Sequence, residues 1–200
     1  MIWFTSDLHL FHENILVWAK KRHHWKTVTE MNEGLVSMWN NVVKDEDTVY
    51  NLGDLAFKTG SQMPLINNYL SALKGKHILI KGNHDSSKKI PLFKNIAEVH
   101  ERLVVNIQGI DFLLSHYPYQ NAMKESDKLE RPECYVNAQY KDGKLLPLIC
   151  GHVHDFFQLK LDCLNCGFDA WGKMLSENDI IEIYEKTSGF KTNLEAYNGI

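Results

Sequence analysis

The residues with the most evident chemical potential form the pattern Gly82-Asn83-His84-Asp85, which closely follows the apolar residues 78–80. An apolar run of this kind is typical of a buried strand, and glycine lets the chain turn sharply after it. The amide oxygen of Asn83 suits a divalent metal, the His84 ring can carry a proton near neutral pH, and the Asp85 carboxylate can orient an imidazole. So short a pattern also arises by chance in loops, so its interpretation depends on the rest of the chain.

Four other segments repeat this design, in which an apolar run ends at residue types that bind metals. These residues are Asp7 and His9, Asp54, His116, and His152 and His154. In parallel α/β sheets the ligand site lies beyond the carboxyl ends of the strands, so five strands could deliver these groups to one crevice. Residues i and i+2 of an extended segment point the same way, so D-x-H and H-x-H can each serve one small site. Imidazole nitrogens with carboxylate and amide oxygens suit Mn, Fe, Zn or Ni better than a thiolate-seeking ion.

The five motifs, in the order D-x-H, G-D, G-N-H-D, a lone His and G-H-x-H, resemble those of the calcineurin-like metallophosphoesterase family. They extend from Asp7 to His154 and so span most of the chain. The resemblance implies a four-layer α-β-β-α sandwich of two mixed β-sheets flanked by helices. Periodicity alone predicts only an α/β fold.

The resemblance also implies a role for each residue of the motifs. The implied ligands of one divalent metal ion are Asp7, His9 and His154. Those of a second ion are Asn83, His116 and His152, and Asp54 would bridge the two ions. His84 would act on the leaving group, and Asp85 would support His84.

These roles predict a dinuclear metal-dependent phosphoesterase. Two metal ions can share a hydroxide, hold a phosphoryl oxygen and stabilise the charge of in-line displacement on a phosphate mono- or diester. His84 is then free to protonate the departing oxygen, a role that typically accelerates a reaction about a hundred- to ten-thousand-fold. We expect Mn²⁺ as the metal, with Fe, Zn or Ni as alternatives. The expected substrate is a small phosphate ester or a nucleotide-like molecule.

Two other functions fit the same motifs. A nuclease or nucleotide phosphodiesterase is favoured by the aromatic and basic residues 18–26, although the extra domain with which DNA-processing relatives hold duplex is absent. A non-catalytic scaffold for protein interaction is the second alternative, but such members usually lose the histidine that this chain keeps as His84. A phosphoprotein phosphatase is disfavoured, because Asp54 is followed by L-A-F-K rather than V-D-R-G, and Asp85 stands where those relatives carry Glu.

Residues 10–27 form an insertion that follows the first ligand pair directly. It could shape the rim of the site, with Arg22 or a lysine meeting phosphate and Trp18 or Trp25 stacking on a base. Alternatively it forms a short helix that packs on the sheet and ends in a solvated charged run. His12 is a candidate for substrate contact on the same argument, with a structural role as the alternative.

Further candidates for substrate contact lie beside other motifs. Lys81 is next to the metal-binding loop and could meet a substrate phosphate, although its side chain could equally extend outward. Tyr117 follows His116 and could form a wall of the crevice. Residues 121–144 lack periodicity and predict a long loop or lid, where substrate choice could reside.

Length and composition set the wider expectations. The 200 residues, 44% hydrophobic and 24% charged, suffice for one compact α/β domain that spans residues 1–200. A net charge of −3 and a pI near 6.4 argue against a protein built for stable nucleic-acid binding. There is no signal peptide and no apolar run of the roughly 18 residues that a membrane span requires, so we expect a cytoplasmic protein. The pair Cys163 and Cys166 has no second C-x-x-C to complete a zinc site, so we expect two small buried residues.

The remaining expectations concern the elements that position the motifs. Apolar residues at helical spacing predict helices over residues 29–43, where Thr27 and Glu30 offer a capping box, and 63–73. A hairpin over residues 102–115 is expected to deliver His116. Further strands are expected at residues 2–4, 48–52, 77–81, 148–150, 156–161 and 180–184, and residues 187–200 form a polar tail without an assignment.

Overall fold

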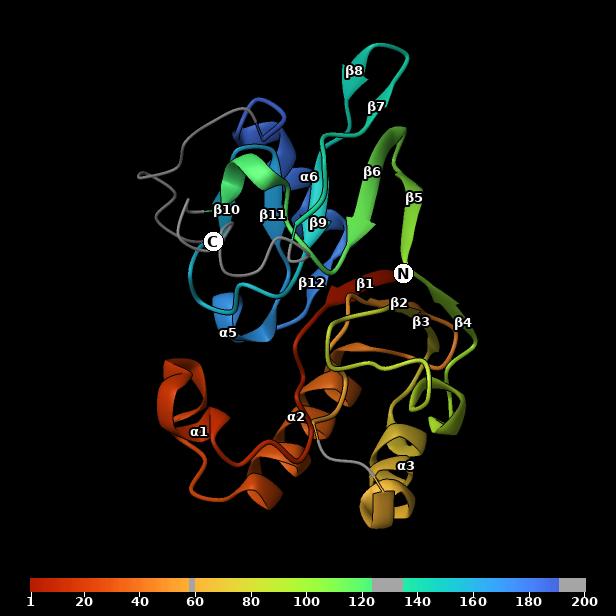
Figure 1. Cartoon of the computed structure of the whole chain (residues 1–200). Helices are drawn as coiled ribbons and strands as arrows, with labels where there is room; N and C mark the ends of the chain where they lie inside the picture. The colour runs from red at the N-terminus through yellow and green to blue at the C-terminus, as the bar shows by residue number, and fades with distance from the viewer. Residues whose placement is uncertain (58–59, 124–134, 191–200) are drawn as a thin grey trace.

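The computed structural model describes residues 1–57, 60–123 and 135–190 (Figure 1). Its main strands are β1 (Ile2–Thr5), β2 (Thr48–Asn51), β3 (Lys76–Ile80), β4 (Glu98–His100), β5 (Arg102–Ile107), β6 (Ile110–Ser115), β9 (Leu148–Cys150), β10 (Leu159–Lys160), β11 (Cys163–Asn165) and β12 (Leu175–Ser176), with a small hairpin of β7 (Tyr140–Lys141) and β8 (Lys144–Leu145). The α-helices are α1 (Ile15–Trp18), α2 (Val28–Val42), α3 (Met63–Ala72), α5 (Phe168–Trp171) and α6 (Glu177–Lys186). Short 3-10 turns are η1 (Lys20–Arg22), η2 (Gly60–Gln62), η3 (Ile90–Leu92) and η4 (Gln120–Ala122).

Two mixed sheets of five strands each make the framework. The first has the order β12-β1-β2-β3-β4, with β1 to β4 parallel and β12 antiparallel to β1. The second has the order β10-β11-β9-β6-β5, in which β9 is parallel to both β6 and β11. The two mixed sheets with their flanking helices are the architecture that the resemblance implied.

Alternating side chains decide what each sheet face contacts. Phe4 of β1 packs with Phe112 and Ile149 of the second sheet, which forms a core between the sheets. Leu113 points the opposite way, into a cluster formed by the segment that follows β6. The outer face of the first sheet is covered by α2 and α3 (Figure 1), where Val49 meets the apolar faces of both helices.

The parallel strands also explain where chemistry can occur. The chain leaves β1, β2 and β3 at the same edge of the first sheet, and it leaves β6 and β9 toward that same region. Each predicted motif begins within a few residues of one of these five exits. The expected delivery of the motifs by successive strands is therefore confirmed.

The two long helices predicted from periodicity are present. Helix α2 begins after Thr27, whose hydroxyl accepts a hydrogen bond from the Glu30 N–H at 3.1 Å. The Glu30 carboxylate bonds the N–H of Lys26 instead of that of Thr27, so only half of the expected capping box forms. The hairpin of β5 and β6 turns at Gln108 and Gly109, both of which have positive φ.

The expected strand at residues 180–184 is wrong, because these residues belong to helix α6. Ser176 and Asp179 form a capping box, with the Asp179 N–H donating to the Ser176 hydroxyl and the Ser176 N–H donating to the Asp179 carboxylate. This local start places Ile180 and Ile183 on one buried helical face. The strand expected at residues 156–161 is reduced to Leu159–Lys160.

Other parts of the sequence interpretation have mixed outcomes. Cys163 and Cys166 are free and buried, and they face different core clusters on opposite sides of the second sheet, as expected of small packing residues. Of the expected long loop, residues 124–134 lie outside the described part of the chain, and residues 140–145 form the β7–β8 hairpin. Residues 191–200 of the polar tail also lie outside it. Within the described ranges, no helix has the length and apolar character needed to cross a membrane.

Candidate metal centre

The loops that leave the five strands carry an unusual backbone. Five of the predicted metal ligands have a left-handed φ: Asp7 at 58°, His9 at 48°, Asp54 at 56°, His152 at 70° and His154 at 47°. For a residue with a Cβ this conformation costs about 1–2 kcal/mol, and such strain gathers at functional sites. The expectation that the D-x-H and H-x-H pairs lie on extended segments is therefore wrong. Turns, rather than strand alternation, aim these side chains.

One group of possible ligands consists of Asp7, His9 and His154, whose ligand atoms all lie within 4.8 Å of one another. Asp7 and His9 are buried, and neither Asp7 Oδ1 nor the two ring nitrogens of His9 have a hydrogen-bond partner among the described residues. Buried polar atoms normally have partners, so this cluster calls for a further one, and a cation fits it. Burial lowers the pKa of His9, so its ring is neutral and suited to bind a metal.

A second group adjoins the first and consists of Asp7, Asp54 and His116, again with ligand atoms within 4.8 Å of one another. The His116 ring is fixed by a hydrogen bond between Nδ1 and the Leu52 carbonyl at 2.6 Å. Its Nε2 lies 2.9 Å from the amide oxygen of Asn83. The same Asn83 oxygen lies 3.0 Å from Nδ1 of His152. The two histidines of H-x-H thus face different groups, since His154 belongs to the first.

Asp54 lies between the two groups. Its Oδ2 is 3.6 Å from Nε2 of His9 and 3.5 Å from Nε2 of His116. Burial, together with the neighbouring carboxylates of Asp7 and Asp85, raises the pKa of Asp54 to about 7. A divalent cation would offset this crowding of negative charge. Asp7 also belongs to both groups, although the family resemblance implied that it binds one ion only.

His84 and Asp85 differ in what they contact. The half-buried His84 donates its backbone N–H to Asp54 Oδ1 at 2.8 Å, and its Nε2 lies 3.9 Å from Asp54 Oδ2. Burial and the nearby Lys89 ammonium lower the pKa of His84. The Asp85 carboxylate is fully buried and accepts the backbone N–H groups of Asp54, Leu55 and Gly82 at 2.7, 3.2 and 3.0 Å. The expectation was that Asp85 supports the His84 ring. In the structure the Asp85 carboxylate instead accepts hydrogen bonds from backbone N–H groups.

Two glycines allow the ligand loops to approach each other closely. A Cβ at Gly151 would lie 1.9 Å from the Ser6 hydroxyl and 2.7 Å from Asp7 Oδ2. A Cβ at Gly82 would lie 2.3 Å from Asp54 Oδ1. The glycines of the G-H-x-H and G-N-H-D motifs are therefore required by space around the carboxylates.

The structure corrects the assignment of Arg22 to substrate phosphate. Arg22 is 0% exposed, and its guanidinium bonds the Asp169 carboxylate and the backbone carbonyls of Asp7 and Leu8. Turn η1 directs the side chain inward, beneath the loop that follows β1. A buried guanidinium with these partners cannot reach a substrate.

The other substrate candidates lie in different surroundings. The His12 ring contacts those of His9 and Phe57, with centroids 5.5 and 3.8 Å apart, and Tyr117 lies 5.0 Å from the rings of both His116 and His152. Both therefore border the centre. Lys81 instead pairs with Glu101 at 2.8 Å, which matches the outward alternative.

The two tryptophans of residues 10–27 lie in different environments. Trp18 is 46% exposed, and its ring lies edge-on to that of His154, with centroids 4.6 Å apart. Trp25 packs against Phe168 and the apolar face of α2, so it contributes to the core. Phe57, which no motif marks, is exposed beside His84, with ring centroids 5.3 Å apart.

The sequence interpretation missed Asp169. This buried carboxylate accepts from Arg22 and also from Nδ1 of His154 at 2.7 Å. It follows the last matched motif by fifteen residues in the chain, and no pattern sets it apart from other acidic residues. Hydrogen bonds from His154 and Arg22 outweigh the effect of burial and lower the pKa of Asp169.

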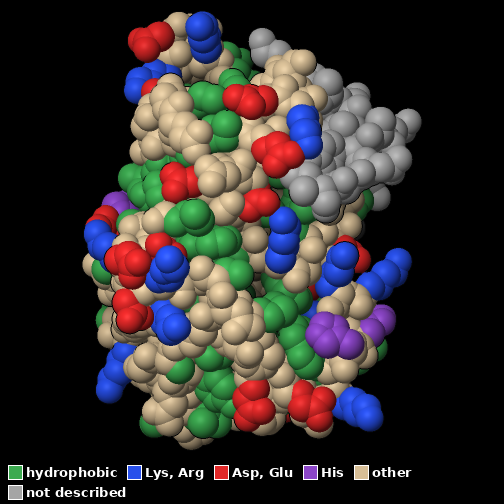
Figure 2. Space-filling model, turned by 180° about the vertical axis from the view of Figure 1, so that it is seen from behind, with side chains coloured by type: hydrophobic (Ala, Val, Ile, Leu, Met, Phe, Trp, Pro, Cys, Tyr) green, Lys and Arg blue, Asp and Glu red, His purple; other side chains and the backbone are tan. Residues whose placement is uncertain are grey.

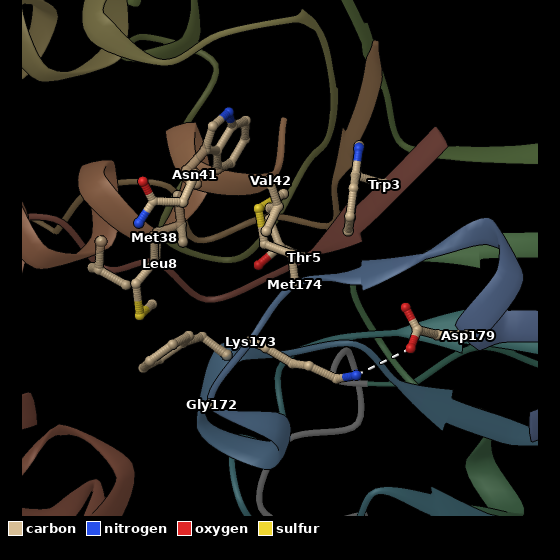
Figure 3. A pocket seen from close by; sticks show the side chains of 13 residues that line it. Trp3, Thr5, Leu8, Met38, Asn41, Val42, Gly172, Lys173, Met174 and Asp179 are labelled. Carbon is tan, nitrogen blue, oxygen red and sulfur yellow. Dashed lines mark hydrogen bonds and ion pairs between the residues drawn. The ribbon is translucent and has the colours of Figure 1, made fainter. Parts of the chain in front are cut away.

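A separate cavity of about 430 Å³ lies between α2 and the segment from α5 to β12 (Figure 3). Its walls are mainly apolar, and its lining includes Leu8, Trp39 and Met174. The only charged pair drawn there is Lys173 with Asp179, 3.0 Å apart (Figure 3). The candidate metal ligands do not line this cavity, because they lie on the loops that follow the strands.

Comparison with known proteins agrees with this geometry. The chain belongs to the calcineurin-like phosphoesterase family, whose model matches residues 1–156. This family acts on phosphate esters with divalent metal ions, and the ligand groups described above fit that class.

The chain is similar to individual proteins from several sources. The Gene 66 protein of Mycobacterium phage L5 is 30% identical over 207 residues, which cover 90% of this chain and 92% of that protein. The uncharacterized protein MJ1445 of Methanocaldococcus jannaschii is 33% identical over 117 residues, 58% of each chain. Among solved structures, the protein of unknown function AQ665 from Aquifex aeolicus has a TM-score of 0.65 at 26% identity, covering 92% of this chain and 98% of that one.

Proposed function

We propose that this protein is a dinuclear metal-dependent phosphoesterase that hydrolyses a small phosphate ester. The observation that carries the proposal is the pair of adjoining ligand groups that share Asp7, with Asp54 Oδ2 between their histidines. The unpartnered Asp7 Oδ1 and His9 nitrogens support a cation at this place. Family membership supports the reaction class.

The chemistry of the donors fits two divalent ions such as Mn²⁺. One ion would be held by Asp7, His9 and His154, the other by Asn83, His116 and His152, with Asp54 shared. Nitrogen and hard oxygen donors of this kind suit Mn, Fe, Zn or Ni. Such an ion pair supplies Lewis acidity, which polarises a phosphoryl oxygen and lowers the pKa of water from 15.7 toward about 7.

The protein's own contribution to bond cleavage would come from His84. Its ring is half exposed, so a substrate can reach it, and its backbone is fixed on Asp54. Nε2 faces the ligand groups, from where it can give a proton to the departing oxygen. Asp85 would serve this step indirectly, because it holds the loop that carries His84 against the loop of Asp54.

A nucleotide-like ester is the substrate that the rim of the centre favours. Trp18, His12 and Phe57 form an aromatic edge beside His154, His9 and His84. An exposed aromatic ring that stacks on a base contributes about 1–3 kcal/mol. On the face shown in Figure 2, positive and negative side chains are interspersed, and no continuous basic area forms among the coloured residues of that face. The net charge of −3 favours a small substrate over a long nucleic acid.

The test is hydrolysis of p-nitrophenyl phosphate and bis-p-nitrophenyl phosphate by metal-stripped protein, with and without Mn²⁺, beside an Asn83→Ala variant. We expect turnover that requires metal and is lost in the variant. A preference for the diester would identify a phosphodiesterase, and the reverse a phosphatase. Two bound ions without turnover of either ester would favour the scaffold alternative. A cytoplasmic location and a single domain over residues 1–200 stay predictions.

A further inference from the structure

The fully buried Arg22 guanidinium has an unusually complete set of partners. Its Nε and Nη2 donate to the two oxygens of Asp169 at 2.6 and 3.1 Å, which is the bidentate arrangement of arginine and carboxylate. Nη1 donates to the Leu8 carbonyl at 2.8 Å, and Nη2 donates to the Asp7 carbonyl at 2.6 Å. Since an unpaired buried charge is strongly destabilising, every one of these bonds restrains the groups around it.

These bonds end at the two chain segments that supply the first ligand group. The carbonyls of Asp7 and Leu8 belong to the left-handed turn that aims Asp7 and His9. Asp169 Oδ2 accepts in addition from Nδ1 of His154. With the proton on Nδ1, the lone pair of Nε2 is free to bind a metal, and the carboxylate fixes the plane of the ring.

The second ligand group is held differently. His116 is oriented by the Leu52 carbonyl, and neither Arg22 nor Asp169 contacts the His116 ring in the described part of the chain. The ligands that belong to the second group alone therefore depend on a different support from that of the first group. A change confined to Asp169 should disturb only the group that contains His154.

We infer that Arg22 and Asp169 are positioning residues, which hold His154 and the turn of Asp7 and His9 in the arrangement that one of the two metal ions requires. The inference rests on the proposed function, because it concerns the same centre. It gives the insertion a structural purpose: residues 10–27 deliver an arginine beneath the metal centre. Neither residue touches substrate in this arrangement.

The test uses Asp169→Asn in the full chain, because asparagine keeps the shape and removes the charge. Titration of metal-stripped protein with Mn²⁺ by calorimetry, and with Co²⁺ by visible absorption, gives the affinity of each ion. We expect one ion to bind about 10- to 100-fold more weakly and the other to bind as in the wild type. Asp111→Asn is the matched control, because Asp111 of β6 pairs with Lys141 of β7 at 2.6 Å, and no candidate metal ligand takes part in this pair. The metal affinities of this variant should be unchanged.

A second variant and a spectroscopic readout keep the outcome decisive. Arg22→Lys keeps the charge but cannot make the two parallel bonds to Asp169, so it should weaken metal binding as well. In metal-free protein at a pH where the ring is neutral, ¹⁵N NMR should place the His154 proton on Nδ1 in the wild type and lose that preference in Asp169→Asn.

Two results would overturn the inference. If a folded Asp169→Asn variant binds both ions as tightly as the wild type does, the positioning role is contradicted and the proposed function is unaffected. A His154 ring that is protonated on Nε2 in the wild-type protein would also contradict the positioning role. Failure of the wild-type protein to bind any metal would count against the proposed function, and the NMR readout would then decide the positioning role alone.

Discussion

The carboxylate of Asp85 accepts a 2.7 Å hydrogen bond from the backbone N–H of Asp54, and so joins the loop that follows β3 to the loop that follows β2. Two further N–H groups, of Leu55 and Gly82, donate to the same carboxylate. Asp54 in turn accepts from the N–H of His84. The proposed bridging carboxylate and the proposed proton donor are thus held by one reciprocal network.

This network predicts that Asp85→Ala destabilises the protein. Three buried N–H groups lose a charged acceptor, and the expected loss is about 2–4 kcal/mol, since a hydrogen bond to a charged group contributes about 1.5–3 kcal/mol and water can replace part of it. Urea unfolding measures the change. Asp45→Ala, at an exposed turn residue, is the control and should alter stability little. Equal stability of wild type and Asp85→Ala would show that the network is unimportant for folding.

Gly151→Ala is predicted to weaken metal binding through sterics alone. The added methyl group would meet the Ser6 hydroxyl and Asp7 Oδ2, and would displace the carboxylate common to both ligand groups. Calorimetric titration with Mn²⁺ should show a loss of at least about tenfold in affinity, by analogy with the effect of disturbing ligand supports.

The control for this variant is Gly109→Ala. Unlike Gly151, Gly109 has a positive φ, of 90°, and a Cβ there would meet no atom within 4 Å. It should therefore lose about 1 kcal/mol of stability through backbone strain and keep its metal affinity. Similar metal affinities in the two alanine variants would contradict the steric argument.

His84→Ala is predicted to keep the metal ions and lose turnover. The loss should be about a hundredfold or more with a phenyl ester, whose leaving group needs a proton, and smaller with a p-nitrophenyl ester, whose leaving group is a weak base. Steady-state kinetics with both esters measure the difference. His100→Ala, on β4 beside Glu98, is a matched control and should leave both rates unchanged. The same loss with both esters would argue against proton donation.

Trp18→Ala and Trp25→Ala are predicted to act on different properties. Trp18 is exposed at the rim, so its removal should raise KM for a nucleotide-like diester on the order of tenfold and leave stability nearly unchanged. Trp25 packs against Phe168, so its removal should lower stability by about 2–3 kcal/mol. Kinetics and thermal unfolding separate the two effects. An unchanged KM in Trp18→Ala would remove the rim from substrate recognition.

Local patterns allowed much of the fold to be predicted. Helix α2 follows from apolar spacing and the Thr27 cap, and the strand exits follow from short apolar runs that end in glycine or polar residues. The expected strand at residues 180–184 is also wrong for a local reason. A short run rich in isoleucine is compatible with the two-residue period of a strand and with the 3.6-residue period of a helix. The capping box of Ser176 and Asp179 decides in favour of the helix.

The candidate ligands could be predicted because each of them follows a strand within an ordered motif. Arg22 could not be assigned correctly, because its burial depends on Asp169, which is 147 residues away in the chain. A basic residue among lysines and histidines has the sequence features of a surface residue. Only the tertiary contact makes it part of the support beneath His154.

Asp54 gives the metal-stripped protein a predictable dependence on pH. Its pKa is raised to about 7 in the folded protein, compared with about 3.9 for an unperturbed aspartate. Between these values the folded state binds more protons than the unfolded state, so this residue's contribution to stability is complete below pH 4 and is lost as the pH rises through 7. Asp54→Asn removes this titration. The stability of the wild type relative to Asp54→Asn, measured by urea unfolding of metal-free protein, should therefore fall from pH 4 to pH 8.

Added Mn²⁺ should restore the stability of the wild type at pH 8, because a cation offsets the repulsion among the carboxylates. It should restore the stability of the variant less. A flat difference across this range would mean that the Asp54 carboxylate is not crowded by its neighbours in the absence of metal.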